Sequence, residues 1–291
     1  MDPVYKILAA LTFARMTMAF QFQSVPALGN ALIAETGMSF AALGALTGAY
    51  LLPGLLVALA GGWLAHWLGA TRVAFAGLAM MTAGGVAGWW VSDYQAALFW
   101  RAVAGVGAVG LNVMLTKMAA DWFEGRHDLP TAMGVLVSSW PAGIALAMVV
   151  LPLCAEVIGP SAALLLPAML CGIGWLALAL VWREPAVKAP SGIAKQRNGF
   201  TRVEWLRVIC AGMIWGTYNV ALIGVIAWTP GLLESGGATP VTAAAATSYI
   251  GWTAIFSVAV GGWLSARARR PDFPALVSFT LSAVLIGCLP Y

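Results

Sequence analysis

Residues 129–154 read LPTAMGVLVSSWPAGIALAMVVLPLC and contain no charged side chain. Because roughly 20 helical residues cross a hydrocarbon core about 30 Å thick, this stretch predicts a membrane-spanning helix. The rest of the 291-residue chain is similar, with 61% hydrophobic and 9% charged residues and a mean hydropathy of +0.88. A soluble domain carries about 25% charged residues. The apolar runs are long and do not alternate with polar residues, so the sequence predicts an all-α membrane protein rather than a β-barrel.

Nine apolar runs are long enough to be membrane-spanning helices. They cover residues 7–34, 40–67, 73–91, 94–118, 129–154, 161–182, 205–228, 241–264 and 273–289. The longest polar stretch, residues 183–203, contains Pro185 and Pro190 and predicts a cytoplasmic linker. It would divide a six-helix bundle at residues 1–182 from the first three helices of a second bundle at residues 204–291.

The basic residues predict the orientation, because Lys and Arg stay on the cytoplasmic side of a membrane. Except for Arg15 and Arg101, all of them lie beside alternate connections: Lys6, Arg72, Lys117, Arg126, Arg183, Lys188, Lys195, Arg197, Arg202, Arg207, Arg267, Arg269 and Arg270. The other connections hold only acidic residues: Glu35, Asp93, Glu156 and Glu234. The N-terminus is therefore expected in the cytoplasm, in a multi-pass protein of the inner membrane.

Several functional classes are not indicated by the residues. The net charge of +4 is not gathered on one solvated face, so no nucleic-acid binding is expected. The cysteines lie in apolar runs without CxxC spacing and are expected to be buried apolar residues: Cys154, Cys171, Cys210 and Cys288. The chain has no phosphate-binding Gly-Lys-Ser/Thr loop, HExxH pair or Ser-His-Asp set. We therefore expect no enzyme, no metal and no cofactor.

Two short sequences recur at nearly the same spacing. AGGWL at residues 60–64 resembles VGGWL at 260–264, an offset of 200, and PAL at 26–28 resembles PGL at 230–232, an offset of 204. The last three predicted helices are therefore expected to repeat the first three. Parallel six-helix repeats would require three further helices, so the nine-helix chain is expected to be a C-terminal truncation of a twelve-helix protein.

Arg15 and Arg101 are the two ionisable residues deep within predicted spans. A charge at the bilayer centre costs about 2.5–3.5 kcal/mol on insertion scales, so each is expected to face a bundle interior or a wet cavity. At 100° per residue, Gln23 lies at the edge of the helical stripe of Arg15, and Asn112 lies on the stripe of Arg101. Each helix would then turn one partly polar face inward.

No predicted span contains a deep Asp or Glu. Two cations without carboxylate partners around one cavity would form a receptor for an anion. Alternatively, each arginine bonds backbone carbonyls and Gln, Asn or Ser side chains at a helix crossing. Proton-driven carriers often relay protons through Asp, Glu or His, but His66 and His127 lie at the cytoplasmic edge. Coupling would then lie in the missing helices, or transport would be uniport, exchange or driven by the charge of the substrate.

Two further features bear on a binding site and on its movement. Tyr218 and Asn219 lie on one predicted helix of the second bundle, and the 204-residue offset places Asn219 opposite Arg15. Such side chains line substrate pockets, although they more often pack and anchor helices. Pro141, close to Gly143, is expected to bend the helix at 129–154, because proline removes one backbone hydrogen bond.

Small residues are expected to let helices approach closely in lipid. The candidate glycines are Gly44 and Gly48 in one span and Gly105, Gly107 and Gly110 in another.

The features above resemble the major facilitator superfamily over essentially the whole chain. The loop between its second and third helices has a G-x-L-x-D-x-x-G-x-x-R/K pattern, which Gly62, Leu64, Gly69 and Arg72 match. His66 stands in place of the aspartate, whose charge contributes to the inward gate in the family.

Two more segments carry the resemblance. Arg101, Gly105 and Gly107 match an R-x-x-x-G-x-G pattern, whose arginine is associated with substrate or proton coupling in the family. The fifth predicted helix resembles the Gly/Pro-rich segment of the family through Gly134, Pro141 and Gly143. The run from residue 15 to residue 26 is similar to the cyanate/nitroimidazole/nitrate-type branch. The resemblance implies inverted three-helix repeats and two bundles that rock around a midplane site.

The sequence thus predicts a monomeric secondary transporter, embedded in a lipid bilayer, for a small anionic solute. The predicted substrate-binding residues are Arg15, Gln23, Arg101, Asn112, Tyr218 and Asn219. One alternative is efflux of hydrophobic or cationic drugs, which would require a carboxylate from further helices. Another is a membrane receptor that does not transport, which the lack of an appended soluble domain disfavours.

Overall fold

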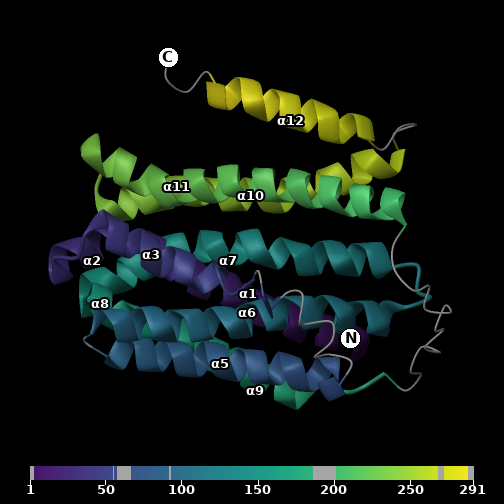
Figure 1. Cartoon of the computed structure of the whole chain (residues 1–291), viewed down its shortest axis with the longest axis horizontal. Coiled ribbons are helices and arrows are strands. Elements are labelled where there is room, and N and C mark those ends of the chain that lie inside the picture. Colours follow the sequence, from purple (N-terminus) through teal and green to yellow (C-terminus); the bar gives the residue numbers. More distant parts are fainter. Residues whose placement is uncertain are drawn as a thin grey trace.

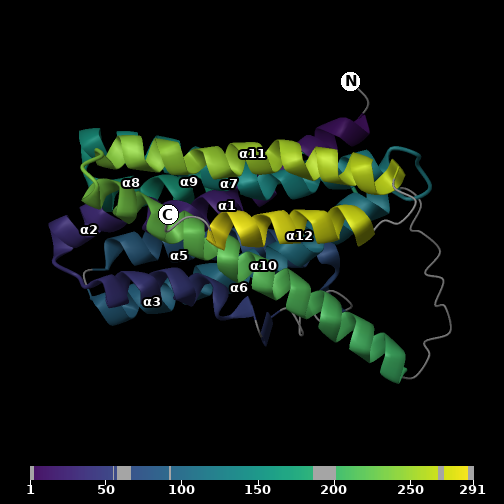
Figure 2. The ribbon, with the colours of Figure 1, turned by 90° about the horizontal axis from the view of Figure 1, so that it is seen from above.

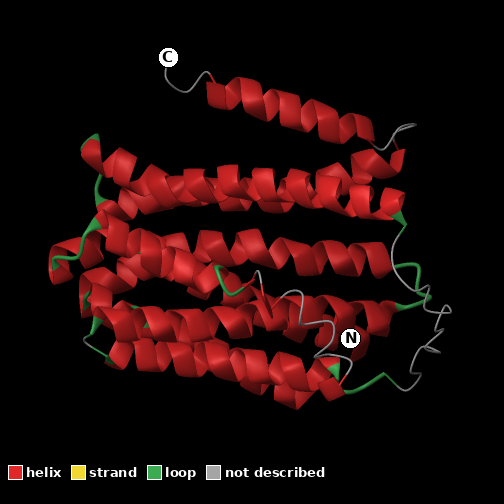
Figure 3. Cartoon of the chain, viewed as in Figure 1, coloured by secondary structure: helices red, strands yellow, loops and turns green. Residues whose placement is uncertain are grey.

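The protein consists of long helices whose direction alternates along the sequence (Figure 1). The structure is a computed structural model that describes residues 3–54, 56–57, 67–91, 93–185, 201–267 and 272–287. The helices are α1 (Pro3–Ala27), α2 (Gly29–Thr36), α3 (Phe40–Leu51), α5 (Ala70–Trp90), α6 (Tyr94–Phe123), α7 (Leu129–Ile158), α8 (Pro160–Ala163), α9 (Leu165–Val181), α10 (Arg202–Ser235), α11 (Pro240–Arg267) and α12 (Asp272–Gly287). No strand occurs within these described ranges, which confirms the predicted all-α class (Figure 3).

Six helical segments in the described part of the chain are long and apolar enough to cross a membrane. They are Ala70–Trp90, Tyr94–Phe123, Leu129–Ile158, Pro160–Val181, Arg202–Ser235 and Pro240–Val258. The other three predicted spans coincide with helices outside this set. Polar residues such as Arg15 and Gln23 lower the hydropathy of α1, whereas α3 and α12 have only 12 and 16 residues.

Two predicted spans are not single helices. The run at 7–34 is divided at Leu28 into α1 and α2, and the run at 40–67 is interrupted at Leu52 and Pro53, where α3 has ended. Proline cannot donate a backbone hydrogen bond, so the helical bond to the carbonyl of residue 49 is missing at the second interruption, although Leu52 itself keeps right-handed helical geometry.

The two ends of the bundle differ in charge. We call the end at which α1 begins the near end and the opposite end the far end. Successive spanning helices alternate in direction, so the described basic residues other than Arg15 and Arg101 come to the near end. Glu35, Asp93, Glu156 and Glu234 come to the far end. The helix directions thus bring about the charge separation that the sequence predicted.

A polar cluster closes one near-end turn. The carboxylate of Asp128 accepts hydrogen bonds from Arg126 and, at 2.7 Å, from the hydroxyl of Tyr5. These two bonds hold the pKa of Asp128 well below its usual range. The cluster ties the start of α1 to the turn before α7.

Glycines bring pairs of helices into backbone contact. α5 and α6 make the most extensive helix–helix contact, in which a Cβ on Gly77 would lie 2.6 Å from the carbonyl oxygen of Gly107. A Cβ on Gly105 would lie 2.1 Å from the oxygen of Tyr50 in α3. The predicted close approach is therefore present at Gly105 and Gly107. Among the described residues it is not found at Gly44 and Gly48, where an added Cβ would meet nothing within 4 Å.

The helices form two groups in space. We call α1–α9 the first helix group and α10–α12 the second helix group. They meet mainly where α11 packs on α7, and an added Cβ on Gly251 would lie 2.8 Å from the carbonyl oxygen of Pro141. The near-end half of α10 splays away from α7 and α11 (Figure 2). Its residues 205–218 are all exposed, whereas Ile226 and Pro230 are buried toward the far end.

Candidate functional site

Arg15 joins three helices of the first helix group. Its Nε donates to Oδ1 of Asn112 on α6 at 2.8 Å. Its Nη1 donates to the carbonyl oxygens of Leu136 and Val137 on α7, at 2.8 and 3.0 Å, and to Oγ of Ser139 at 3.3 Å. Among the described residues, Nη2 has no hydrogen-bond partner. Of the predicted site residues, Arg15 and Asn112 are therefore brought into direct contact.

The carbonyl of Val137 is available because of Pro141. In an uninterrupted α-helix the amide of residue 141 would donate to the carbonyl of residue 137. Proline has no N–H, so this carbonyl has no donor within α7. The guanidinium of Arg15 supplies the missing donor from α1. The helix runs through Pro141 from Leu129 to Ile158, and the predicted bend stays a prediction.

Arg101 has the same relation to a second proline. Its Nη2 donates at 2.9 Å to the carbonyl oxygen of Phe22, the acceptor that Pro26 leaves free in α1. Its Nη1 donates to Oγ of Ser24 at 3.3 Å, and its guanidinium lies 4.7 Å from the ring centroid of Tyr50. The Nε of Arg101 is buried without a partner among the described residues. Each deep arginine thus bonds a backbone carbonyl that a proline has freed.

Neither arginine has a carboxylate partner within the described ranges. The ion pairs found there join Lys117 to Asp121 and Arg126 to Asp128, both toward the near end. These contacts match the alternative that the sequence left open, in which arginines bond backbone carbonyls and amide or hydroxyl groups at a helix crossing. A carbonyl satisfies a donor but does not cancel a charge, so no carboxylate of the described residues neutralises either of these two positive charges.

The two arginines do not share either of the two cavities described for this part of the chain. Arg101 lines a cavity of about 620 Å³ inside the first helix group, toward the far end, together with Gln21, Ser24 and Asp93. Arg15 is not among the residues that line it. Neither of these cavities therefore has two cations around a single opening, and the shared opening that the sequence suggested stays a prediction.

The other predicted substrate residues, Gln23, Tyr218 and Asn219, each have a partner other than Arg15 or Arg101. Gln23 is buried and donates to Sδ of Met148 on α7 at 3.0 Å. Asn219 donates to the carbonyl oxygen of Trp215 in its own helix at 2.8 Å. Tyr218 packs against Phe279 of α12, with ring centroids 6.3 Å apart. The structure therefore does not bring Tyr218 and Asn219 into contact with Arg15.

The loop motif is described only in part. Gly62 and His66 lie outside the described residues. Gly69 has φ +83°, a conformation that favours glycine, and it immediately precedes α5. Arg72 lies in the first turn of α5 and is exposed. Gly143 packs against α1, where an added Cβ would lie 2.4 Å from the carbonyl oxygen of Met16.

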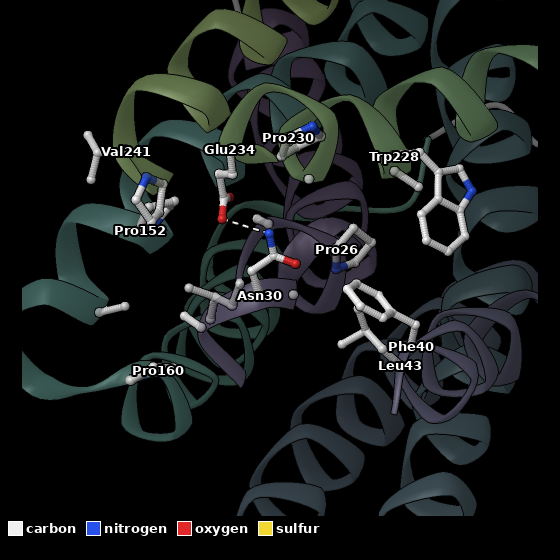
Figure 4. A pocket seen from close by; sticks show the side chains of 18 of the residues that line it. Pro26, Asn30, Phe40, Leu43, Pro152, Pro160, Trp228, Pro230, Glu234 and Val241 are labelled. Carbon is white, nitrogen blue, oxygen red and sulfur yellow. Dashed lines mark hydrogen bonds between the residues drawn. The ribbon is translucent and has the colours of Figure 1, made fainter. Parts of the chain in front are cut away.

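The far end holds a contact between the two helix groups. Nδ2 of Asn30 on α2 donates to Oε2 of Glu234 on α10 at 2.6 Å, and Figure 4 shows the two side chains pointing toward each other. A cavity of about 180 Å³ at this place is lined by both residues and by Pro26, Pro230 and Glu156, among others. Asn30 and Glu234 are 204 positions apart. This separation equals one offset of the internal repeat that the sequence predicts.

Sequence reasoning missed several partners in these contacts. They include Tyr50, Ser139 and the carbonyls of Phe22 and Val137. A usable signal was present, since each freed carbonyl lies four residues before a proline within a helix. The pairing of Asn30 with Glu234 was also contained in the repeat offset, but nothing in the sequence indicated that equivalent positions meet.

The fold and the buried polar contacts define a multi-pass helical membrane protein. The family model of the Major Facilitator Superfamily matches residues 8–291, and the chain therefore belongs to this superfamily. Comparison with the curated proteins gives no match.

Solved transporters share the fold. A D-xylose-proton symporter has a TM-score of 0.70 at 14% identity, with 91% of this chain and 70% of the symporter covered. The inward-open xylose transporter XylE from E. coli has a TM-score of 0.56 at 14% identity, with 90% and 67% covered. A peptide transporter POT in complex with sulfate has a TM-score of 0.56 at 17% identity, with 90% and 52% covered. This chain thus spans about half the length of the peptide transporter.

Proposed function

We propose that the chain belongs to a secondary transporter that moves a small anionic solute across the inner membrane by alternating access. Family membership and the fold shared with solved sugar and peptide transporters support the transport activity. Residues 1–182 would form one moving bundle and residues 204–291 part of the other, joined by a linker at 183–203. The small-molecule partner would be the transported solute, which is moved without being chemically changed. The protein would act as a monomer.

The anionic character rests on one observation, the uncompensated charge of Arg15. The acceptors that contact its guanidinium are neutral, and Nη2 has none in the described part of the chain. Attraction between unit charges grows as the effective dielectric constant falls, so a partly buried cation attracts an anion more strongly than an exposed one. Arg15 and Asn112 would bind the solute directly, whereas Arg101 would contribute through its field or in another conformation.

The conformation supports an alternating mechanism. The helix groups are bonded at the far end through Asn30 and Glu234, whereas the near-end half of α10 diverges. We interpret this as the state open to the near end. Tyr218 and Asn219, now on the divergent half of α10, would approach Arg15 when the near end closes. Gln23, which donates a hydrogen bond to Met148, would keep α1 and α7 in contact.

Replacement of Arg15 tests the anion proposal. In proteoliposomes, Arg15→Met is expected to lower the initial flux of labelled small anions by about tenfold to a hundredfold, since a hydrogen bond to a charged group contributes about 1.5–3 kcal/mol. Lys117→Met removes the same charge from an exposed near-end pair and is the matched control, with less than about a twofold change expected.

Undiminished anion flux in Arg15→Met would contradict the proposal. Undiminished flux in Arg101→Ala would remove only Arg101 from the mechanism. A neutral solute carried equally well by the parent protein and Arg15→Met would place the transporter in another substrate class.

The orientation is a separate proposal, supported by the basic near end. With the native cysteines replaced, a cysteine at position 72 in place of Arg72 is expected to react with an impermeant maleimide only after the membrane has been permeabilised. A cysteine at Glu35 is expected to be labelled in intact cells. The reverse pattern would show that the N-terminus lies outside.

We also propose that the parent protein has twelve helices, of which this chain contains nine. The internal repeat supports this number, because the second copy would otherwise contain three helices where the first contains six. Membership of the cyanate/nitroimidazole/nitrate-type branch is proposed on the run from residue 15 to residue 26.

A further inference from the structure

Three contacts converge on two successive turns of α7, around Pro141. The carbonyl of Val137 is bonded by Arg15, and the carbonyl of Pro141 touches the position of Gly251 on α11. Two residues further, Gly143 lies against the backbone of α1. The turn that proline weakens is therefore also the place where the second helix group packs on the first.

The same pairing occurs twice, which indicates that it is a feature of this fold. Both deep arginines bond the carbonyl four residues before a proline, at 3.0 Å for Arg15 and 2.9 Å for Arg101. The Arg101 pair joins two helices of the first helix group, α1 and α6. Of the two pairs, it is the Arg15 pair that combines such a bond with the contact between the groups at Gly251.

We propose that Arg15 is a positioning residue for the contact between the two helix groups. By donating to Val137, it fixes the backbone of α7 at Pro141 and hence the surface on which α11 packs. Without this donor, the freed carbonyl would lack a partner in a low-dielectric interior, and the backbone would shift to find one.

The same guanidinium links the solute to this contact, a step that rests on the proposed function. An anion that binds Nη1 together with the free Nη2 competes with the carbonyl of Val137 for Nη1, because hydrogen bonds between ionised partners are roughly twice as strong as neutral ones. As Arg15 turns toward the anion, the carbonyl of Val137 in α7 loses the hydrogen bond from Arg15. The packing of α11 then changes, and solute binding is transmitted to the two helix groups through this one side chain.

The test separates two roles of Arg15, the hydrogen bond to the carbonyl of Val137 and the positive charge. It does so by restoring the backbone N–H that Pro141 lacks. Spin labels at Val135 and Val208, both exposed, report the separation of α7 and α10 in the full chain. Arg15→Met is expected to change the ratio of the distance populations by about tenfold, as expected for one hydrogen bond to a charged group. Adding Pro141→Ala should restore the ratio to within about threefold, because the introduced alanine would supply an N–H to the carbonyl of Val137.

Pro152→Ala is the matched control, since Pro152 also lies inside α7 but the carbonyl that it frees is not bonded by either deep arginine. It should not rescue Arg15→Met. Failure of Pro141→Ala to rescue, or equal rescue by Pro152→Ala, would overturn the proposal. If Arg15→Met does not accumulate, Arg15→Ala combined with each proline replacement gives the same comparison through yield and thermal stability.

The outcome is independent of the anion proposal. Rescue of the distances with no anion flux in any variant would support the positioning role and reject the proposed substrate. Loss of anion flux in Arg15→Met with unchanged distances would support the substrate and reject the positioning role.

Discussion

Oxidation of a cysteine pair at Asn30 and Gly231 is expected to stop transport, and reduction is expected to restore it. A Cβ added at Gly231 would lie 3.8 Å from Nδ2 of Asn30, so the two positions face each other across the helix groups at the far end. Alternating access requires this end to open, because the central site must be exposed to each side of the membrane in turn. A covalent bond here should reduce flux to the background of empty liposomes.

The pair must be made without the native cysteines Cys154, Cys171, Cys210 and Cys288. A control pair joins two helices of the first helix group, Thr82→Cys on α5 with Gly172→Cys on α9. A Cβ at Gly172 would lie 3.6 Å from Cγ2 of Thr82, a comparable separation. Cross-linking this pair should leave flux within about twofold of the reduced sample, because the helices stay in one moving bundle.

Full flux from a sample in which Asn30→Cys and Gly231→Cys are quantitatively cross-linked would show that the far end does not open during transport. Loss of flux in both pairs would instead indicate that any cross-link inactivates the chain. The measured quantity is therefore the flux of the cross-linked control pair divided by the flux of the cross-linked Asn30/Gly231 pair. This ratio is expected to exceed about tenfold.

Replacing Gly143 by alanine is expected to produce the largest loss of stability from a single methyl group on α7. The new Cβ would lie 2.4 Å from the carbonyl oxygen of Met16 and 2.7 Å from Cβ of Ala19. The first obstacle is backbone, which cannot rotate away as a side chain can, so α1 and α7 would have to separate. Overpacking of this kind typically costs about 1–3 kcal/mol and occasionally more.

Gly134→Ala is the matched control on the same helix, because an added Cβ at Gly134 meets nothing within 4 Å. Alanine also has the higher helix propensity, so this change should be neutral or slightly stabilising. Thermal or denaturant unfolding in detergent measures both variants. Equal stability of Gly143→Ala and Gly134→Ala would mean that the backbones of α1 and α7 are not in contact where Gly143 faces Met16.

The sequence alone determined the class of the protein. Long apolar runs can satisfy their backbone hydrogen bonds in lipid only as helices or closed barrels, and the runs here do not alternate. The positions of the basic residues also required helices of alternating direction, and the helix order agrees. Local chemistry was less decisive at Leu52 and Pro53, where an apolar run continued although the helix did not.

Only the tertiary structure decided what the deep arginines contact. Arg15 and its acceptor Val137 are 122 positions apart, so no local pattern joins them. The position of a proline reveals that a carbonyl is free, but not which side chain reaches it. Likewise, the repeat made Asn30 and Glu234 equivalent, but their contact depends on how α2 and α10 meet at the far end. Such pairings follow from helix packing, which is set by many small residues at once rather than by any single stretch.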